Sequence, residues 1–508
     1  MIVNRTFVIA LLATLAVSHA AIAQPESDAL DALVRQGMAD WHVPGMAVAV
    51  TGPDRVLFSR GYGRTGDGGP PVDEHTLFAI ASTTKAMVAA GVLMLQDEGL
   101  LKLDDLAVDH LQELQFKPSW VTREITVRDL LTHRTGLAST DFMRFFQDMP
   151  LNEQLPRLRH VSPSASPRAR FQYQNTMYVL AGEVIARVSG KPWPEFLRER
   201  LWQPVGMRET FASRAEFVGS DLRRVRPHLY LDGEIVVAQW DLPDDRYSAA
   251  GSVWSTLHDL TLWTQFLLRG GVTADGTRLL SEDAYAEMFR PQMLVDEEAF
   301  YPTLRLTRPQ WMSYGLGWFQ QDFQGRRVDF HTGSLSGLIA LIGLDRAGGL
   351  GVIVLGNQDH AELRHAVLWH VMDDGVTPPR RDWGRDILRL YAETRREDAE
   401  QWARLSAARD TESVPSLPLD GYTGRYHNPA YGTLEVARGG DALELRSARI
   451  TMRLSHWEGD TFLAEWPEWE LRQTVPFELD GAGRARAFEA FGARFVRSIG
   501  PERLPAGD

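Results

Sequence analysis

The spacing of apolar residues changes along this chain and predicts alternating regions of strand and helix. Two short apolar runs, 46–51 and 56–62, flank Gly52-Pro53-Asp54, which is typical of a hairpin. Helical spacing then dominates from about residue 82 to residue 290, and strand spacing returns between residues 314 and 355. Strands on both sides of a long helical region predict one antiparallel sheet built from distant chain segments, with the helical region inserted as a second lobe. A cleft is expected where the two lobes meet.

Individual elements can be placed within this plan from their periodicity. The expected helices span 86–95, 127–131, 178–188, 193–202, 257–268 and 361–372. A polar hairpin turns at Asp232-Gly233, and the later strands are expected at 314–320, 328–331, 338–344 and 351–355. The predicted fold class is therefore α/β of the α+β kind, an antiparallel sheet flanked by helices with a helical lobe.

The C-terminal quarter follows a different pattern. After Pro378-Pro379 a charged helical stretch runs to about Arg409, and a proline-containing linker ends near Pro418. The remainder alternates short strands with glycine turns, which predicts a small all-β, barrel-like domain. The predicted divisions are residues 1–23, a main domain over 24–380, a helical linker over 381–415 and the all-β domain over 416–500.

The first 23 residues are typical of an export signal. Arg5 gives a basic start, residues 7–17 are apolar, and Ala21-Ile22-Ala23 supplies the small residues of a cleavage site before Gln24. The apolar run is short for a membrane span. We therefore expect a periplasmic or extracellular protein without integral membrane association after cleavage; the alternative is an uncleaved N-terminal anchor.

The amino-acid composition of the chain excludes several kinds of site and partner. The chain has no cysteine, which excludes disulfides, thiolate nucleophiles and cysteine metal sites, and its net charge is −13 without any basic run, which argues against nucleic acid as a partner. His360, His365 and His370 recur at five-residue steps, a spacing that does not align them on one helix face, so no metal site is expected. We predict no cofactor and a small-molecule or peptide substrate; the oligomeric state stays open.

Lysine is rare here, and one lysine has a notable position. The chain has four lysines and fifty arginines, and Lys85 follows Ser82 by three residues in Ser82-Thr83-Thr84-Lys85, at the expected start of a helix. Arginine stays charged, whereas lysine can lose its proton and could then activate a neighbouring serine. The alternative is a helix-capping serine beside a solvated lysine.

Two further motifs accompany this pair. Tyr173-Gln174-Asn175 precedes a helix, and His331-Thr332-Gly333-Ser334 ends a strand. In order and separation the three motifs resemble those of the serine β-lactamase and penicillin-binding-protein superfamily, most closely its class C branch and the related esterases and D-aminopeptidases. The resemblance covers about residues 30–375 and continues in residues 130–137, 204–207, 250–256 and 314–318. The C-terminal module is similar to an appended lipocalin-like domain.

The resemblance implies a role for each residue. Ser82 would attack a carbonyl and become acylated, and Lys85 would hold or accept its proton. Tyr173 would act as general base or relay. The backbone N–H groups of Ser82 and Ser334 would form the oxyanion hole. The implied substrate-binding residues are Asn175, His331, Thr332 and Gly333.

One position departs from the family pattern. Where most penicillin-binding proteins and β-lactamases have lysine, this chain has His331, which is shorter and nearly neutral at physiological pH. The change favours amide or ester substrates without an essential carboxylate. We therefore predict an exported serine hydrolase that acts through an acyl-serine intermediate, of the D-aminopeptidase or esterase kind. The alternatives are a β-lactamase or D,D-carboxypeptidase, and a non-hydrolytic penicillin-binding-type sensor.

His133, Trp254 and Trp318 are further aromatic candidates. His133 lies in a loop typical of the family and is expected to be a packed structural histidine. Trp254 and Trp318 either rim the cleft or belong to the core.

Overall fold

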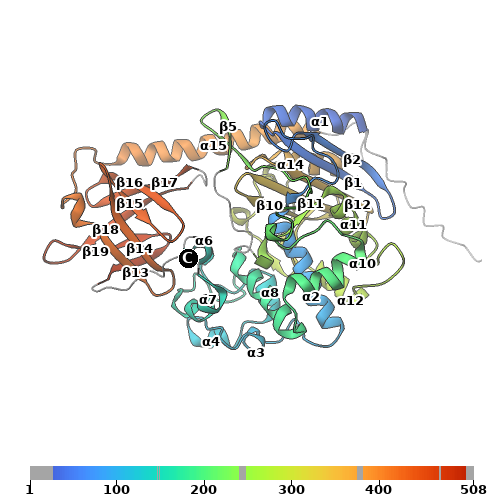
Figure 1. The fold of residues 1–508 in the computed structure, drawn as a ribbon, viewed down its shortest axis with the longest axis horizontal. Helices are drawn as coiled ribbons and strands as arrows, with labels where there is room; N and C mark the ends of the chain where they lie inside the picture. The colour runs from blue at the N-terminus through green and yellow to red at the C-terminus, as the bar shows by residue number, and fades with distance from the viewer. Residues whose placement is uncertain are drawn as a thin grey trace, which may run out of the picture.

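A computed structural model describes residues 27–145, 147, 149–238, 248–373, 381–467 and 471–498 (Figure 1). The predicted export signal, residues 1–23, lies outside the described residues, and so does Pro378-Pro379.

Among the described residues, eight strands form one antiparallel sheet in the order β2-β1-β12-β11-β10-β9-β8-β7. The strands are β1 (Gly45–Thr51), β2 (Val56–Gly63), β7 (Met293–Leu294), β8 (Met312–Tyr314), β9 (Phe319–Phe323), β10 (Arg326–Leu335), β11 (Leu338–Asp345) and β12 (Leu350–Gly356). β1 pairs with β12, for example Val48 opposite Val354. The two ends of the main domain therefore meet in one sheet, and the predicted fold class is confirmed.

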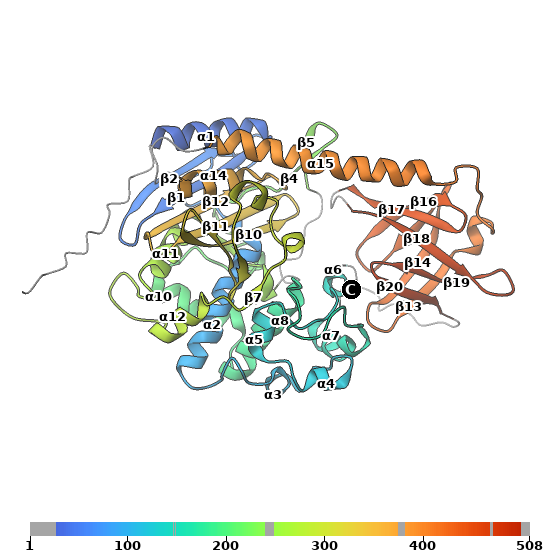
Figure 2. The ribbon, with the colours of Figure 1, turned by 180° about the vertical axis from the view of Figure 1, so that it is seen from behind.

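Both faces of this sheet are buried, which explains why its central strands are apolar throughout. In β1, Met46 and Val48 pack on one side with α1 (Ser27–Asp40) and α14 (Leu363–Asp373), and Ala47 and Ala49 pack on the other. Successive side chains of a strand point to opposite faces, so a sheet covered on both sides needs apolar residues at every position. Figures 1 and 2 show α1, α14 and the long α15 (Trp383–Ala408) on one side, and α2 (Thr84–Asp97), α8 (Asn175–Ser189) and α11 (Leu257–Leu268) on the other.

The helical lobe is built from short elements around α2 and α8. Its helices are α3 (Ala107–His110), α4 (Ser119–Thr122), α5 (Val127–Leu131), α6 (Asp141–Phe145), α7 (Leu151–Arg157), α9 (Trp193–Leu197), a π-helical turn (Arg198–Trp202), α10 (Gln203–Val205) and α12 (Glu282–Met288). α13 (Leu304–Thr307) lies on the other side of the sheet, where Leu304 and Leu306 pack against the cluster that includes α1 and α14. The 3-10 turns are η1 (Ala81–Thr83), η2 (Leu158–His160), η4 (Arg214–Glu216), η6 (Ser248–Ala250) and η7 (Glu297–Ala299). Two small ribbons pair β3 (Phe78–Ala79) with β6 (Trp254–Ser255), and β4 (His228–Leu231) with β5 (Glu234–Val237).

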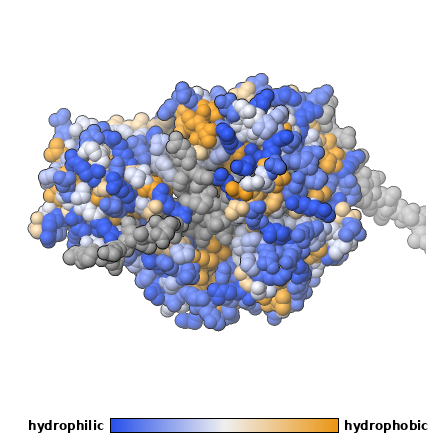
Figure 3. All heavy atoms as spheres, viewed as in Figure 1, coloured by the Kyte–Doolittle hydropathy of each residue, from blue (hydrophilic) through white to orange (hydrophobic). Residues whose placement is uncertain are grey.

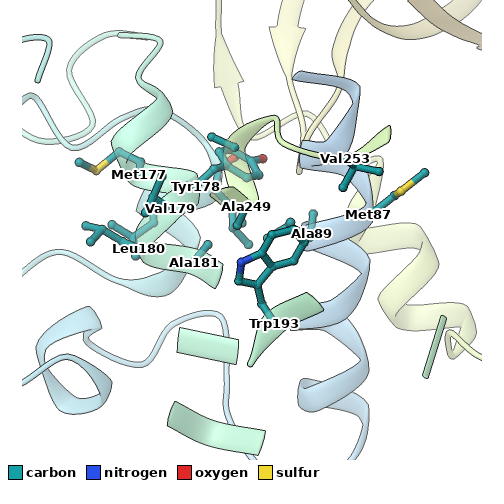
Figure 4. Close-up of a cluster of buried hydrophobic side chains, with 14 of the residues drawn as sticks. Met87, Ala89, Met177, Tyr178, Val179, Leu180, Ala181, Trp193, Ala249 and Val253 are labelled. Atoms are coloured by element: carbon teal, nitrogen blue, oxygen red, sulfur yellow. The ribbon is translucent and has the colours of Figure 1, made fainter. Parts of the chain in front are cut away.

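The lobe is held together by close packing around α8. Figure 4 shows Trp193 pointing toward Ala89 of α2 and Ala249 of η6. Gly182 of α8 leaves no room for a side chain, since a Cβ there would lie 2.4 Å from the Cβ of Ala249. The bare helix surface lets η6 approach α8 closely, and this contact fixes the segment that contains Ala250 relative to the start of α8.

The C-terminal module is a closed barrel at the far end of α15 (Figure 2). Its strands are β13 (Gly424–Asn428), β14 (Gly432–Gly439), β15 (Ala442–Arg446), β16 (Thr451–Glu458), β17 (Thr461–Trp466), β18 (Leu471–Leu479), β19 (Ala485–Ala490) and β20 (Ala493–Arg497), after the 3-10 turn η8 (Leu419–Gly421). The predicted all-β domain is present. Its first and last strands, β13 and β20, were not predicted, and they pair with each other to close the barrel.

Two strand predictions in the main sheet were wrong in detail. The single strand expected at 314–320 is two strands, β8 and β9, with a turn between them that contains Gly317. Gly317 has a φ of +85°, and a Cβ there would lie 2.8 Å from the Cα of Ala86, so this turn packs against the start of α2. β10 also extends beyond the expected 328–331, because its polar residues 332–334 continue the pairing with β11.

The surface seen in Figure 3 is mostly hydrophilic, with hydrophobic residues in small, scattered patches. Among the described residues, no helix combines the length and the apolar character needed to cross a membrane.

Candidate active site

Ser82 lies in a tight turn between a strand and a helix. β3 ends at Ala79, and η1 leads directly into α2. Ala81 has a φ of +47°, in the left-handed region, which costs a residue with a side chain about 1 kcal/mol. Strained backbone of this kind is concentrated at functional sites. The turn leaves Ser82 partly exposed, while Lys85 is completely buried.

Strand β10 passes directly against this turn. A Cβ on Gly333 would lie 2.3 Å from the carbonyl oxygen of Ile80 and 2.9 Å from the Cβ of Ala81. Only glycine allows the two backbones to come this close. Ser334, the next residue of β10, is exposed at the end of this contact. The structure thus brings β10 against the turn that leads into Ser82, the two segments expected to form the oxyanion hole.

The amine of Lys85 has three hydrogen-bond partners. Its Nζ lies 2.9 Å from Ser82 Oγ, 2.9 Å from Asn175 Oδ1 and 2.8 Å from the carbonyl oxygen of Ala250. Burial lowers the pKa of Lys85 to about 7, and the nearby Asp141 carboxylate opposes this shift. The amine can therefore lose its proton near neutral pH.

The three partners also decide where the lone pair of a neutral amine points. The Ala250 carbonyl and Asn175 Oδ1 can only accept hydrogen bonds, whereas the Ser82 hydroxyl can also donate. A neutral amine has two N–H donors and one lone pair. When Lys85 is neutral, its two donors satisfy Ala250 and Asn175, and its lone pair faces the Ser82 hydroxyl.

Asn175 owes its orientation to Asp141, a residue that the sequence motifs did not identify. The backbone N–H of Asn175 donates to Asp141 Oδ1 at 3.1 Å, and its Nδ2 donates to Asp141 Oδ2 at 3.0 Å. A carboxylate accepts both bonds, so the amide oxygen of Asn175 is left facing Lys85. Burial raises the pKa of Asp141, and the Lys85 ammonium opposes that shift.

Tyr173 lies over the same group. The Lys85 Nζ is 4.9 Å from the centroid of its ring, and the ring packs against His133 with centroids 4.4 Å apart. Burial raises the pKa of Tyr173 well above its ordinary value, while a hydrogen bond with Ser82 acts in the opposite direction. The phenol is therefore neutral at rest. A cavity of about 270 Å³ opens beside Tyr173, and its lining includes Ser139, Arg170 and Glu298.

His331 of β10 is uncharged and lies near Tyr173, with their ring centroids 6.1 Å apart. It is 2% exposed, and burial lowers its pKa to about 3, with the Lys85 charge acting in the same direction. Its Nδ1 lies 2.6 Å from the carbonyl oxygen of Thr332, which can only accept, so Nδ1 bears the proton. Its Nε2 then accepts from the Tyr314 hydroxyl at 3.1 Å. Both ring nitrogens are thus bound by protein groups.

Arg364 lies behind the same strand and was also missed from the sequence. Its Nη1 donates to the carbonyl oxygen of Gly333 at 2.7 Å and to Ser334 Oγ at 2.8 Å. Glu362 forms a bidentate pair with it, at 3.0 and 2.9 Å. Thr332 is held separately, with its Oγ1 2.8 Å from the Tyr301 hydroxyl. β10 is therefore fixed by buried polar groups whose charges balance.

The remaining candidates belong to the interior. His133 is fully buried, and its Nδ1 accepts from the backbone N–H of Gln174 at 3.2 Å, as expected of a packed structural histidine. Trp254 and Trp318 are both buried in the core. In the described part of the chain, no group of three or more histidine, aspartate or glutamate side chains has the arrangement of a metal site.

Comparison with known proteins identifies the class. The sequence model described as Beta-lactamase matches residues 30–377, and a domain of unknown function matches residues 408–499. The first match spans well over half of the chain. The chain therefore belongs to the beta-lactamase family, and the resemblance inferred from the motifs is confirmed.

Individual relatives agree with this assignment. The unguisins hydrolase ungD' of Aspergillus campestris is 29% identical over 434 residues, which cover 80% of this chain and 76% of that protein. The octameric penicillin-binding protein homologue from Pyrococcus abyssi shares the fold over 93% of this chain and 100% of its own, with a TM-score of 0.61 and 20% identity. A D-stereospecific amidohydrolase from Streptomyces sp. is similar over 68% of this chain and 98% of its own, with a TM-score of 0.55 and 26% identity. The protein is thus a hydrolase of the β-lactamase and penicillin-binding-protein family.

Proposed function

We propose that this protein cleaves amide or ester bonds through an acyl-Ser82 intermediate, with the neutral Lys85 amine as the base. The observation that carries the proposal is the position of Lys85 Nζ, 2.9 Å from Ser82 Oγ and bound otherwise by two groups that can only accept. An amine in this environment is ready to take the serine proton.

The reaction follows from these contacts. Ser82 Oγ attacks the substrate carbonyl carbon as its proton passes to Lys85 Nζ, and the backbone N–H groups of Ser82 and Ser334 stabilise the oxyanion. The bond to the leaving group breaks as a proton is delivered to the departing nitrogen or oxygen. Water then attacks the acyl carbon, loses a proton to the same base, and releases the acid while Ser82 regains its hydroxyl hydrogen.

Tyr173 serves in this scheme as a relay. Its raised pKa keeps the phenol protonated, so it is a poor resting base, whereas the Lys85 pKa of about 7 suits proton acceptance near neutral pH. The Tyr173 hydroxyl gives its proton to the leaving group and accepts in its place the proton that Lys85 holds.

The charge state of His331 and Arg364 favours substrates without an essential carboxylate. Neutral His331 offers no charge to an anion, and the positive charge of Arg364 is balanced by Glu362. Amides and esters therefore fit better than β-lactams. Similarity to an unguisins hydrolase and to a D-stereospecific amidohydrolase supports amide bonds, with D-amino-acid amides as the first substrates to test.

A substrate panel tests the proposal. Purified protein should release p-nitrophenol steadily from p-nitrophenyl acetate and hydrolyse D-amino-acid amides faster than nitrocefin, and Ser82→Ala should abolish both activities. A burst without steady release would replace the proposal with a sensor that acylates once. Nitrocefin turnover comparable with the ester rate would favour a β-lactamase.

The proposed site of action is outside the cytoplasm. Support comes from the first 23 residues, with their basic start, apolar run and small-residue cleavage site. Mass spectrometry of the protein secreted by an expressing cell should find Gln24 at the N-terminus; an intact Met1 on the exported protein would favour an uncleaved anchor.

A further inference from the structure

The C-terminal barrel contacts the active-site lobe through the turns between its strands. The Tyr431 hydroxyl, in the β13–β14 turn, donates to the carbonyl oxygen of Ser139 at 2.9 Å. Phe491, in the β19–β20 turn, packs its ring against Phe142 with centroids 3.6 Å apart. Figures 1 and 2 both show this end of the barrel beside α6. Two barrel turns therefore hold residues 139–143, here called the Asp141 segment.

A third contact lies just beyond this segment. The Nε2 of Gln147 donates to the backbone carbonyl of Thr433, again in the β13–β14 region, at 2.9 Å. Tyr431 itself is only 7% exposed. Burial raises the pKa of Tyr431, and the charge of Asp141 adds to that shift. The barrel and the helical lobe therefore meet in an interface with specific hydrogen bonds and ring packing.

The Asp141 segment leads directly to the reacting groups. Asp141 accepts both hydrogen bonds that orient Asn175, and Asn175 Oδ1 accepts from Lys85 Nζ. Ser139, whose carbonyl is held by Tyr431, also lines the cavity beside Tyr173. Three successive contacts thus join the barrel to the amine of Lys85.

We propose that the barrel is part of the active-site structure, with Tyr431 as a positioning residue that acts through the Asp141 segment on Asn175 and Lys85. The inference rests on the proposed function, because its test measures the ester hydrolysis proposed above. α6 is a helix of only five residues, too short to be stable by itself, so its place depends on what packs against it. A small displacement of Asn175 would turn the Lys85 amine away from Ser82, and displacements near 1 Å can reduce rates by about 100-fold.

The barrel has a second attachment that supplies a matched control. Trp457 of β16 packs against Trp402 of α15, with ring centroids 5.2 Å apart, and the guanidinium of Arg409 lies 4.8 Å from the Trp457 ring centroid. Both Tyr431 and Trp457 are large aromatic residues of the barrel that contact the rest of the chain. Of these two residues, Tyr431 contacts the Asp141 segment, whereas Trp457 contacts α15.

The experiment compares Tyr431→Ala with Trp457→Ala in the full chain, using p-nitrophenyl acetate hydrolysis and thermal unfolding. We expect Tyr431→Ala to lower kcat/KM by about 30-fold, mainly through kcat, and Trp457→Ala to lower it by less than about threefold at a similar loss of thermal stability. Equal kinetic losses in the two variants would overturn the proposal. Tyr431→Phe, which removes only the hydroxyl, should fold normally and lose about threefold to tenfold; wild-type kinetics in that variant would also count against it.

A double-mutant cycle tests the path of the effect. If Tyr431 acts through Asn175, Tyr431→Ala should cost less than about threefold in an Asn175→Ala background. Full additivity of the two losses would contradict the proposed path. The Ser82→Ala control separates the outcomes: wild-type activity that depends on Ser82, together with unaffected Tyr431 variants, would sink this inference and leave the proposed function intact.

Discussion

Two carboxylates in the helical lobe, those of Asp129 and Asp141, have opposite surroundings. Asp129 is fully buried and binds two arginines, with Arg134 Nε at 2.6 Å and Arg168 Nη2 at 2.7 Å. Burial favours its neutral form, but the hydrogen bonds from Arg168, the Thr126 backbone and Arg134 outweigh this effect and lower its pKa. The Asp129 carboxylate and the guanidinium groups of Arg134 and Arg168 therefore keep their charges.

Asp141 is placed differently, because Asn175 stands between it and Lys85. Burial raises the pKa of Asp141 and lowers the pKa of Lys85 to about 7. Arginine cannot give up its proton in a protein, whereas a buried lysine can. The comparison indicates that the Asp129 cluster stabilises the lobe, and that the Asp141 cluster keeps a proton mobile next to Ser82.

The largest expected effect comes from placing an arginine in the Asp141 cluster, as in the Asp129 cluster. Lys85→Arg should lower kcat/KM by about 1000-fold or more, because the guanidinium keeps its protons and cannot accept the one on Ser82. Steady-state hydrolysis of p-nitrophenyl acetate measures the loss. Lys191→Arg is the control, since that exposed lysine pairs with Glu199 at the surface and should tolerate the change. Activity within tenfold of wild type in Lys85→Arg would remove Lys85 from the proton transfer.

The converse variant breaks the first cluster. Asp129→Asn leaves two arginines without their buried carboxylate and should lower the free energy of unfolding by about 3 kcal/mol, while kcat/KM at 25 °C falls less than tenfold. Urea unfolding and ester hydrolysis give the two quantities. Asp104→Asn, which removes an exposed partner of Arg128, should cost less than about 1 kcal/mol. A kinetic loss at Asp129 as large as that of Lys85→Arg would erase the distinction between the clusters.

The pH dependence of the wild type follows from the pKa of Lys85. Below about pH 7 the amine is protonated and has no lone pair for Ser82, so kcat/KM should fall by about tenfold per pH unit on the acidic side and level off above pH 7. The value of kcat/KM rises with pH because the base is active in its deprotonated form. A pH profile of ester hydrolysis measures it, and a profile that is flat from pH 5 to 8 would argue against a lysine base.

The smallest effect concerns the charge of Asp141. Asp141→Asn removes the negative charge that opposes the shift at Lys85, and its single oxygen can accept only one of the two hydrogen bonds that Asn175 donates. The pKa of Lys85 should fall further, so the acidic limb of the pH profile should move to lower pH by less than about one unit, and the plateau should fall because Asn175 loses one acceptor. A move to higher pH would mean that the charge does not act on Lys85.

The parts of the site that could be predicted are those encoded locally. Ser82 and Lys85 are three residues apart at a helix start, which places them together wherever the helix lies. The same is true of α11, whose apolar spacing gave its bounds of Leu257–Leu268 correctly. The pairing of β1 with β12 was also accessible, since strands at both ends of the domain need partners in one sheet.

Asp141 and Arg364 could not be found in this way. Asp141 is 34 residues from Asn175, and Arg364 is 30 residues from Ser334, so each meets its partner only after the chain has folded. Neither belongs to a motif with a fixed spacing. The strands β13 (Gly424–Asn428) and β20 (Ala493–Arg497) escaped prediction for a related reason, because they are short and rich in polar residues and gain their partners only when the barrel closes.

The ionisation state of Lys85 is the central claim, and the scarcity of lysine makes it directly measurable. Protein labelled with ¹³C-lysine has only four lysine side chains to resolve by NMR. One Cε signal should titrate with a midpoint near pH 7 and be missing from the spectrum of Lys85→Arg. If all four signals kept their protonated shifts up to pH 9, Lys85 would be charged at neutral pH and could not be the base for Ser82.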